Sequence, residues 1–349
     1  MTAAQVAVIG AGSWGTALAK VLSDQGRPVW LWGHRPAQVA AIRQSRRNEE
    51  YLPGFVLNDQ VRPVAALQEA VAGRKLVIMV VPSHVFRGVF QELVPYLDPE
   101  VYLLSAAKGI ENDSLLTMTQ VMAEVLGAAG RAVAQSGRPG AALGVLAGPS
   151  FAKEVAAGQP TAVTVAAQGR PAAQFFQKSL STERFRVYTS TDVIGLELGG
   201  ALKNIVAIAA GICDGLGYGT NTRAALITRG LAEITRLGVA MGATPLTFSG
   251  LGGLGDLVLT CTGDLSRNRT VGLKLGQGKT LPTILAEMQM VAEGIKTTQA
   301  AQALARRLGV EMPILEQVYR IIYQDKPCEA AVNDLLTRDV GDELSLNHA

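Results

Sequence analysis

The chain has 349 residues, of which 48% are hydrophobic and 17% charged, so it can bury a large core and is long enough for two domains. This composition argues against disorder. The formal net charge of +3 gives no reason to expect nucleic acid as a partner, because a nucleic-acid surface needs Lys and Arg clustered on one face.

The cysteines and histidines are few and scattered. Cys213, Cys261 and Cys328 show no CxxC spacing, and with the three histidines they form no pattern typical of a metal site. We therefore expect no metal. No segment resembles a targeting sequence, and the apolar stretches 76–81 and 205–212 are too short to cross a bilayer. We expect a cytoplasmic protein without membrane insertion.

The first half of the sequence alternates short β-branched runs with helical patterns. A helix is predicted at residues 12–25, and a loop rich in Ala and Gly at 128–142. Strands are predicted at residues 5–9, 28–32, 75–81, 101–105, 143–147, 162–167 and 185–188. Such alternation is typical of a mainly parallel sheet covered by helices on both faces.

The pattern changes near residue 190, after which helical periodicity dominates. A long helix is predicted up to about residue 214, with Thr191 or Asp192 as its N-cap, and residues 339–349 are predicted to be a loose tail. We therefore predict an α/β protein. Residues 1–190 form a Rossmann-type doubly wound sheet, and residues 191–349 an all-helical domain.

A glycine-rich turn follows the first predicted strand. Its sequence, Gly10-Ala-Gly12-Ser-Trp-Gly15, fits G-x-G-x-x-G and lies between a strand and a helix, as a dinucleotide site requires. Gly10 would allow the tight turn, Gly12 the approach of a pyrophosphate to the backbone, and Gly15 close packing of helix on strand. The alternative is a glycine-rich turn without a ligand.

The second predicted strand ends Trp32-Gly-His34-Arg35, without the carboxylate that grips the ribose 2′-hydroxyl of NAD in many dinucleotide sites. Arg35 instead offers a planar guanidinium for a 2′-phosphate. We therefore predict NADP or NAD as cofactor, with NADPH bound at least as well as NADH. The alternative is that Arg35 stacks on the adenine, which would accept either cofactor.

Lys203 lies on the long predicted helix, where it should lean back over Gly199 and Gly200. We interpret the two glycines as leaving room for a substrate, and the apolar residues that follow as lowering the pKa of Lys203 toward neutrality. Such a lysine could exchange a proton with a carbinol or carbonyl oxygen while hydride moves at carbon. The alternative is a lysine at the surface.

Four further segments carry candidate site residues. Lys108 follows the strand predicted at 101–105, at the edge of the sheet where ligands bind, and Ser150 could cap a strand-to-helix turn. The glycines of residues 250–256 indicate close approach of the backbone to something. Arg267 and Asn268 could supply a fork and an amide for a phosphate, or belong to a polar loop between helices.

Taken together, these segments closely resemble the bacterial type of NAD(P)-dependent glycerol-3-phosphate dehydrogenase, over nearly the whole chain. The most specific segment is Gly200-Ala-Leu-Lys203-Asn-Ile-Val-Ala-Ile-Ala-Ala-Gly211. Segments 147–154, 250–256, 264–268 and 291–294 match as well. The loop at 128–142 is longer than is usual for the family, and the C-terminal tail has no counterpart.

The resemblance implies an oxidoreductase that interconverts sn-glycerol 3-phosphate and dihydroxyacetone phosphate, with Lys203 as proton acceptor. It implies substrate contacts from Lys108, Gly148, Ser150, Lys203, Asp256, Ser266, Arg267 and Asn268. It implies cofactor contacts from Ser13, Trp14, His34, Arg35, Lys108, Ala152, Arg267, Val291 and Glu293. It also implies a cytoplasmic homodimer that supplies glycerol 3-phosphate for phospholipids.

Two other functions remain open at this point. A related β-hydroxyacid dehydrogenase would share the dinucleotide unit and a helical lysine, but would not need the segment 264–268. A non-catalytic nicotinamide-sensing module would have no use for Lys203 beside two glycines.

Overall fold

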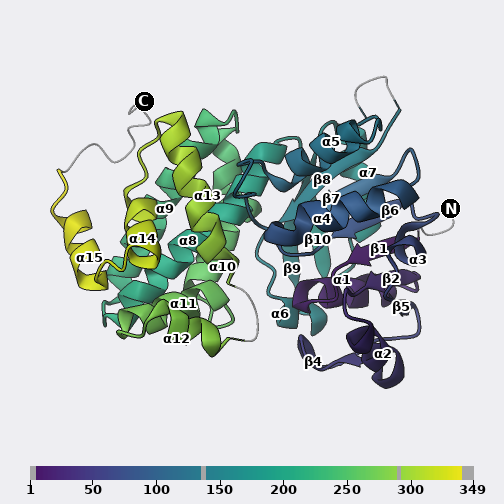
Figure 1. The fold of residues 1–349 in the computed structure, drawn as a ribbon, viewed down its shortest axis with the longest axis horizontal. Coiled ribbons are helices and arrows are strands. Elements are labelled where there is room, and N and C mark those ends of the chain that lie inside the picture. The colour runs from purple at the N-terminus through teal and green to yellow at the C-terminus, as the bar shows by residue number, and fades with distance from the viewer. Residues whose placement is uncertain (1–4, 135–138, 289–291, 340–349) are drawn as a thin grey trace. The chain divides into compact units, whose positions relative to one another are not determined.

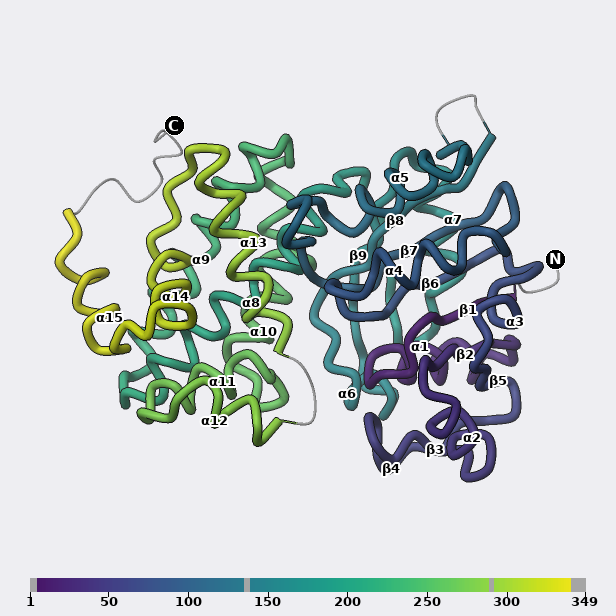
Figure 2. Tube along the Cα trace, in the orientation of Figure 1, coloured from purple at the N-terminus to yellow at the C-terminus, as the bar shows by residue number. Residues whose placement is uncertain are grey.

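The computed structural model describes residues 5–134, 139–288 and 292–339 (Figures 1 and 2). The chain divides into two compact units. Unit 1 comprises residues 1–107 and 118–193, and unit 2 comprises residues 108–117 and 194–349. The short segment 108–117 therefore leaves unit 1 and packs with unit 2.

Unit 1 contains one large sheet in the described part of the chain. Its eight strands are β1 (Val6–Ile9), β2 (Val29–Trp32), β5 (Val61–Val64), β6 (Leu76–Met79), β7 (Tyr102–Ser105), β8 (Ala142–Ala147), β9 (Thr161–Ala167) and β10 (Phe185–Ser190). They lie in the order β10-β9-β8-β7-β6-β1-β2-β5, and all neighbours are parallel except β8 and β9. The direction of winding reverses between β1 and β6, and ligands of such sheets bind at this switch point.

Helices connect the parallel strands, as parallel pairing requires. They are α1 (Ser13–Ser23), α2 (Pro36–Ser45), α3 (Leu67–Val71), α4 (Ser83–Leu93), α5 (Met118–Ala128), α6 (Ala152–Ala156) and α7 (Arg170–Leu180), with a short 3-10 turn η1 (Val94–Tyr96). Every residue of β1, β2 and β6 is buried, because helices cover both faces of the sheet (Figure 1). The predicted α/β fold is confirmed, and each predicted strand is present.

Sequence reasoning missed three strands. β5 contains Pro63, which removes a backbone donor, but β5 pairs only with β2 and forms the edge of the sheet, where a missing donor is tolerated. β3 (Arg47–Asn48) and β4 (Leu52–Val56) form a small antiparallel hairpin. Their short lengths and the Pro53-Gly54 pair hid them from a search for apolar runs.

Two predicted irregular segments lie partly outside the described residues. α5 ends at Ala128 and β8 begins at Ala142, so the predicted loop between them is present, although residues 135–138 are not described. Of the predicted C-terminal tail, only Asp339 is described.

Unit 2 is helical throughout its described residues. Its helices are α8 (Val193–Gly215), α9 (Thr220–Ala240), η2 (Pro245–Ser249), η3 (Leu251–Gly255), α10 (Asp256–Thr262), α11 (Arg267–Gly276), α12 (Leu281–Ala286), α13 (Glu293–Leu308), α14 (Pro313–Tyr323) and α15 (Cys328–Leu336). The predicted long helix is confirmed to within two residues at each end.

α8 is the central helix of unit 2. Our statement that its apolar stretch is too short to cross a bilayer is wrong, because residues 205–212 belong to a 23-residue helix whose most apolar 18-residue part has a mean hydropathy of 1.6. In the structure, 89% of its most apolar part is buried against other helices, which is typical of the core helix of a soluble protein. The surrounding helices therefore supply the apolar environment that α8 needs.

Glycines let α8 and α11 approach until their backbones touch. A Cβ at Gly272 of α11 would lie 1.9 Å from the carbonyl oxygen of Ile208 on α8. The same backbone contact, with distances of 2.0 to 2.4 Å, recurs at Gly211, Gly215 and Gly276. Residues four apart lie on one helix face, so each helix presents a glycine pair to the other. This contact fixes the position of α11 against α8.

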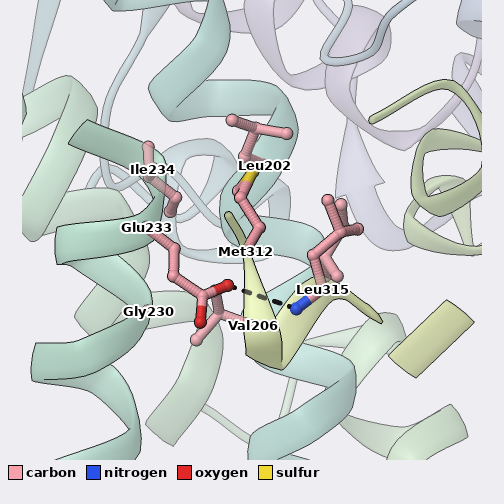
Figure 3. A pocket seen from close by; sticks show the side chains of 8 residues that line it. Leu202, Val206, Gly230, Glu233, Ile234, Met312 and Leu315 are labelled. Atoms are coloured by element: carbon pink, nitrogen blue, oxygen red, sulfur yellow. Dashed lines mark hydrogen bonds between the residues drawn. The ribbon is translucent and has the colours of Figure 1, made fainter. Parts of the chain in front are cut away.

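A buried carboxylate joins α9 to α14 behind α8. Glu233 accepts hydrogen bonds from the backbone N–H groups of Ile314 (2.8 Å) and Leu315 (3.2 Å), in the first turn of α14. Figure 3 shows the bond to Leu315. It therefore satisfies donors that a helix leaves without intrahelical partners at its N-terminus. The same group lines a cavity of about 10 Å³ beside Val206 of α8. Burial raises the pKa of Glu233 to about 7, although both N–H groups lower it.

The glycine contact between α8 and α11 predicts an unusual effect of alanine. Gly272→Ala should destabilise the protein by about 2–3 kcal/mol or more, because the new methyl group must push the two backbones apart. On the exposed face of α4, a Cβ at Gly88 would meet no described atom within 4 Å. Gly88→Ala should therefore stabilise by up to about 1 kcal/mol. The measurement is the free energy of unfolding of both variants in urea. Equal changes in the two variants would contradict the role of Gly272 in the helix contact.

Glu233 predicts a pH dependence of stability. Its folded pKa of about 7 exceeds the usual glutamate pKa of 4.5, so between these pH values the folded state holds a proton that the unfolded state has released. Its contribution to stability should fall as the pH rises from about 4.5 to about 7, by a few kcal/mol in all.

The measurement is the free energy of unfolding of wild type minus that of Glu233→Gln, which should decrease over this pH range. Glu329→Gln, at an exposed position of α15, controls for the loss of one carboxylate. If the difference in unfolding free energy between wild type and Glu233→Gln stays constant from pH 4.5 to 8, the pKa of Glu233 is not raised in the folded state.

Candidate active site

Two lysines and one aspartate form a buried cluster in unit 2. Lys108 Nζ lies 2.7 Å from Asp256 Oδ2, and Lys203 Nζ donates to the other carboxylate oxygen, Oδ1. Lys203 also donates to Thr260 Oγ1 at 2.8 Å. The structure thus brings together three residues that the sequence placed far apart, because Lys108 belongs to the segment that packs with unit 2.

The cluster is almost inaccessible to solvent except at Lys108. The Asp256 side chain is 1% exposed, that of Lys203 6% and that of Lys108 18%. Burial lowers the pKa of Lys203 below its usual range; Asp256 opposes this effect and Lys108 adds to it. Burial works to raise the pKa of Asp256, but attraction by the two lysines outweighs it and holds that pKa below its usual range. The predicted direction of the Lys203 shift is confirmed.

Our interpretation of Gly199 as room for a substrate is wrong. A Cβ at this position would lie 2.6 Å from the carbonyl oxygen of Gly252, so Gly199 allows η3 to touch α8. Asp256 lies four residues after Gly252, and Lys203 four residues after Gly199. The backbone contact therefore places the two side chains within reach one helical turn further on. Two glycines of residues 250–256 therefore approach protein backbone: Gly252 meets Gly199, and a Cβ at Gly253 would lie 2.1 Å from the carbonyl oxygen of Phe248.

An asparagine pair links α8 to α11 next to this cluster. Asn268 Nδ2 donates to Asn204 Oδ1 at 2.9 Å, and Asn268 Oδ1 accepts from the backbone N–H of Gly294 at 3.0 Å. Both amides are buried. Asn268, a predicted substrate contact, is therefore held in one orientation by the neighbour of Lys203 and by the first turn of α13.

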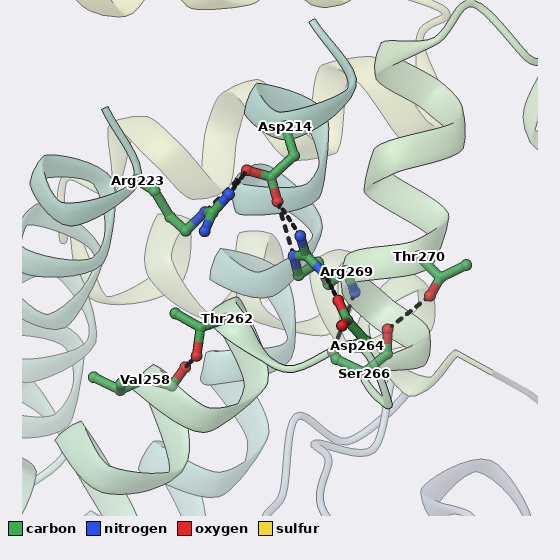
Figure 4. A network of polar contacts seen from close by, with 8 residues as sticks. All are labelled: Asp214, Arg223, Val258, Thr262, Asp264, Ser266, Arg269 and Thr270. Atoms are coloured by element: carbon green, nitrogen blue, oxygen red, sulfur yellow. Dashed lines mark hydrogen bonds and ion pairs between the residues drawn. The ribbon is translucent and has the colours of Figure 1, made fainter. Parts of the chain in front are cut away.

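The start of α11 is held by an ion-pair network (Figure 4). Asp214, in the last turn of α8, accepts from Arg223 Nε (2.9 Å) and from Arg269 Nε (2.8 Å), and Arg269 also pairs with Asp264. Ser266 caps α11, because its hydroxyl accepts from the backbone N–H of Arg269. Arg267, the predicted phosphate ligand, is the exposed first residue of this anchored helix.

In unit 1, the glycine-rich turn has the geometry of a dinucleotide loop. Gly10 has φ +126°, and a Cβ there would lie 3.0 Å from the backbone carbon of Val80, just after β6. A Cβ at Gly15 would lie 1.9 Å from the carbonyl oxygen of Gly10, so the predicted close packing is confirmed. At Gly12, the N-cap of α1, a Cβ would meet no described atom within 4 Å. The backbone at Gly12 is therefore accessible to a ligand.

Side chains from elsewhere fix this turn. The carbonyl oxygen of Ala11 accepts from Gln38 Nε2 and from Asn48 Nδ2, both at 2.9 Å, and Asn48 also donates to Thr16 Oγ1 at 2.7 Å. Ser13 Oγ, a predicted cofactor contact, donates to the carbonyl oxygen of Tyr51. The β3–β4 hairpin is thus attached to the dinucleotide turn.

The other predicted cofactor contacts of unit 1 lie in several elements. His34 and Arg35 follow β2, and Ala152 begins α6. Trp14 is half-buried, with its ring 6.4 Å from that of Phe185.

Two predicted substrate residues, Gly148 and Ser150, lie in the turn after β8. Gly148 has φ +142°, and a Cβ there would lie 2.8 Å from the Cα of Val163. The prediction that Ser150 caps a helix is wrong: its hydroxyl donates to the carbonyl oxygen of Gly148, and Phe151 is the N-cap of α6. Ser150 therefore shapes the turn itself. Of the two remaining cofactor predictions, Val291 lies outside the described residues, and Glu293 begins α13.

Sequence reasoning missed Thr260, Asn204 and Asn48. Thr260 stands four residues after Asp256 on one helix, so this spacing could have placed both on the face that meets Lys203. No local signal identifies Asn48, whose partners are 32 and 37 residues away. Among the described residues, no group of three His, Cys, Asp or Glu side chains could hold a metal ion.

Comparisons with known proteins extend over both units. Residues 5–173 match the family model described as NAD-dependent glycerol-3-phosphate dehydrogenase N-terminus, and residues 192–333 match the corresponding C-terminus model.

Individual relatives match at nearly full length. The chain is 54% identical to a glycerol-3-phosphate dehydrogenase (NAD(P)+) of Syntrophobacter fumaroxidans, over 98% of both chains. It is 57% identical to one of Desulfotalea psychrophila, over 97% of this chain and 98% of the relative. A crystal structure of glycerol-3-phosphate dehydrogenase from Coxiella burnetii superposes with a TM-score of 0.90 at 40% identity, covering 96% of this chain and 99% of that one.

Proposed function

The chain belongs to the NAD-dependent glycerol-3-phosphate dehydrogenase family, and we propose that it interconverts sn-glycerol 3-phosphate and dihydroxyacetone phosphate with NADP(H) or NAD(H). The observation that carries this proposal is the buried cluster of Lys203, Asp256 and Lys108. The family matches over both units favour this function over a β-hydroxyacid dehydrogenase and over a nicotinamide-sensing module.

Lys203 supplies the proton chemistry of the reaction. Among the described residues its ammonium donates to Asp256 and Thr260, which leaves one of its three N–H groups for a substrate oxygen. In reduction, Lys203 gives a proton to the carbonyl oxygen of dihydroxyacetone phosphate as hydride reaches the carbon. In oxidation, it takes the hydroxyl proton of glycerol 3-phosphate. Its lowered pKa suits both directions near neutral pH.

The residues of unit 1 fit a nicotinamide dinucleotide. When bound, this cofactor supplies or accepts the hydride. The backbone at Gly12 and the N-terminus of α1 would hold the pyrophosphate, because helix N-termini favour anions. Arg35 would reach a 2′-phosphate, so NADPH should bind at least as well as NADH. The remaining proposed cofactor contacts are Ser13, Trp14, His34, Ala152, Val291 and Glu293.

The proposed substrate contacts divide into two groups. Asp256 and Lys108 hold the cluster around Lys203, with Gly148 and Ser150 as further contacts. Ser266, Arg267 and Asn268 hold the phosphate at the anchored start of α11. We propose residues 1–190 as the NAD(P)-binding domain and residues 191–349 as the substrate domain. We also propose a cytoplasmic homodimer that supplies glycerol 3-phosphate for phospholipid synthesis.

Lys203→Ala should reduce turnover by about 100-fold or more, the usual scale for a general acid–base group. Lys203→Arg should not restore it, because a guanidinium does not release its proton near neutral pH. The measurement is steady-state oxidation of NADPH with dihydroxyacetone phosphate, in protein shown by circular dichroism to be folded and by fluorescence to bind NADPH.

Lys279→Ala provides the matched control, because Lys279 lies in the same unit but forms an exposed ion pair with Glu287. Its turnover should equal that of wild type. Near wild-type turnover of Lys203→Ala would show that another group handles the proton.

Arg267→Ala should raise the KM for dihydroxyacetone phosphate by roughly tenfold or more, through loss of a charge-assisted contact to the phosphate. Activity with unphosphorylated dihydroxyacetone should change much less, since that substrate has no phosphate to lose. Arg307→Ala, at an exposed position of α13, is the control. An unchanged KM for dihydroxyacetone phosphate would disprove this role of Arg267.

A further inference from the structure

An ion pair lies directly after β2, where dinucleotide sites of this fold read the ribose of the adenosine. Arg35 Nη2 donates to Glu50 Oε2 at 2.5 Å, and also lies 3.2 Å from the Tyr51 hydroxyl. The side chains of Arg35 and Glu50 are 43% and 46% exposed, so a ligand can reach both.

Glu50 supplies the carboxylate that is missing from the end of β2. In many NAD sites an acidic residue at this place binds the ribose 2′-hydroxyl. Here β2 is followed by Gly33, His34 and Arg35, and the carboxylate comes instead from the β3–β4 hairpin, 15 residues after Arg35. A search of the sequence next to β2 could not find it.

The hairpin is fixed to the dinucleotide turn, so the position of Glu50 is determined by more than a surface ion pair. Asn48, which is 2% exposed, binds Ala11 and Thr16, and the carbonyl oxygen of Tyr51 accepts from Ser13. These contacts flank Glu50 on both sides in the sequence. They hold its backbone at the same turn that would hold the cofactor pyrophosphate.

We propose that Arg35 and Glu50 together determine which dinucleotide the enzyme accepts, an inference that rests on the proposed function. The 2′-phosphate of NADPH pairs with Arg35 and displaces Glu50, because a phosphate carries more negative charge than a carboxylate. With NADH the ion pair persists, and the Glu50 carboxylate accepts a hydrogen bond from the ribose 2′-hydroxyl. Glu50 therefore favours NADH and opposes NADPH, and Arg35 favours NADPH.

The experiment measures the Kd of NADPH and of NADH by fluorescence titration of the full chain. Glu50→Gln should bind NADPH about two- to fivefold more tightly than wild type and NADH more weakly by a similar factor, the scale of a half-exposed ion pair. Arg35→Ala should weaken NADPH binding by about tenfold or more and NADH binding much less. Glu49→Gln removes the same charge from the adjacent exposed position and should leave the ratio of the two Kd values unchanged.

The outcomes separate this inference from the proposed function. If Glu50→Gln changes both Kd values equally, or no more than Glu49→Gln does, the role of Glu50 is overturned while dinucleotide binding stands. If wild type binds neither dinucleotide, both fail. The effect should persist with adenosine 2′,5′-bisphosphate and AMP as probes, because it concerns the ribose alone. An effect confined to whole dinucleotides would also overturn it.

Discussion

Backbone contact at glycines is the constraint on which unit 2 depends. α8 is buried on nearly all sides, and its neighbours touch its backbone where a side chain would collide with a carbonyl oxygen. Gly199 lets η3 contact the backbone of α8, and Gly211 and Gly215 let α11 do the same. The contact at Gly199 lies one turn from the pair of Asp256 and Lys203, and the contact of Gly272 with the backbone of Ile208 lies one turn from the pair of Asn268 and Asn204. The geometry of the reacting groups thus follows from helix packing, with apolar side chains filling the remaining space.

The cluster formed by these contacts balances burial against charge. An unpaired lysine at the depth of Lys203 would lose its proton to avoid the cost of an isolated buried charge, and an unpaired aspartate would gain one. Asp256, shared between Lys203 and Lys108, lowers that cost while burial still lowers the pKa of Lys203. With both lysines protonated the cluster carries a net positive charge, which suits a phosphorylated substrate and the developing alkoxide.

Unit 1 uses polar side chains for a similar purpose. Gln38 and Asn48 hold the carbonyl oxygen of Ala11, and so fix the glycine-rich turn that glycines alone would leave mobile. The hairpin that carries Asn48 also carries Glu50. Stability of the turn and recognition of the ribose are therefore supplied by one short segment between β2 and β5.

The sequence by itself determined the alternation of strands and helices, the long helix α8 that carries Lys203, and the glycine-rich turn. These features depend on residues close together in the chain, whose periodicity and backbone preferences are readable locally. Tertiary structure alone decided that Gly199 faces the backbone of Gly252, that one aspartate bridges two lysines, and that Glu50 meets Arg35. It also decided that the strand containing Pro63 lies at the edge of the sheet. The paired groups lie 15 to 148 residues apart in the sequence, and the place of Pro63 depends on β5 having only one neighbouring strand. No local sequence pattern encodes which distant segments will pack together.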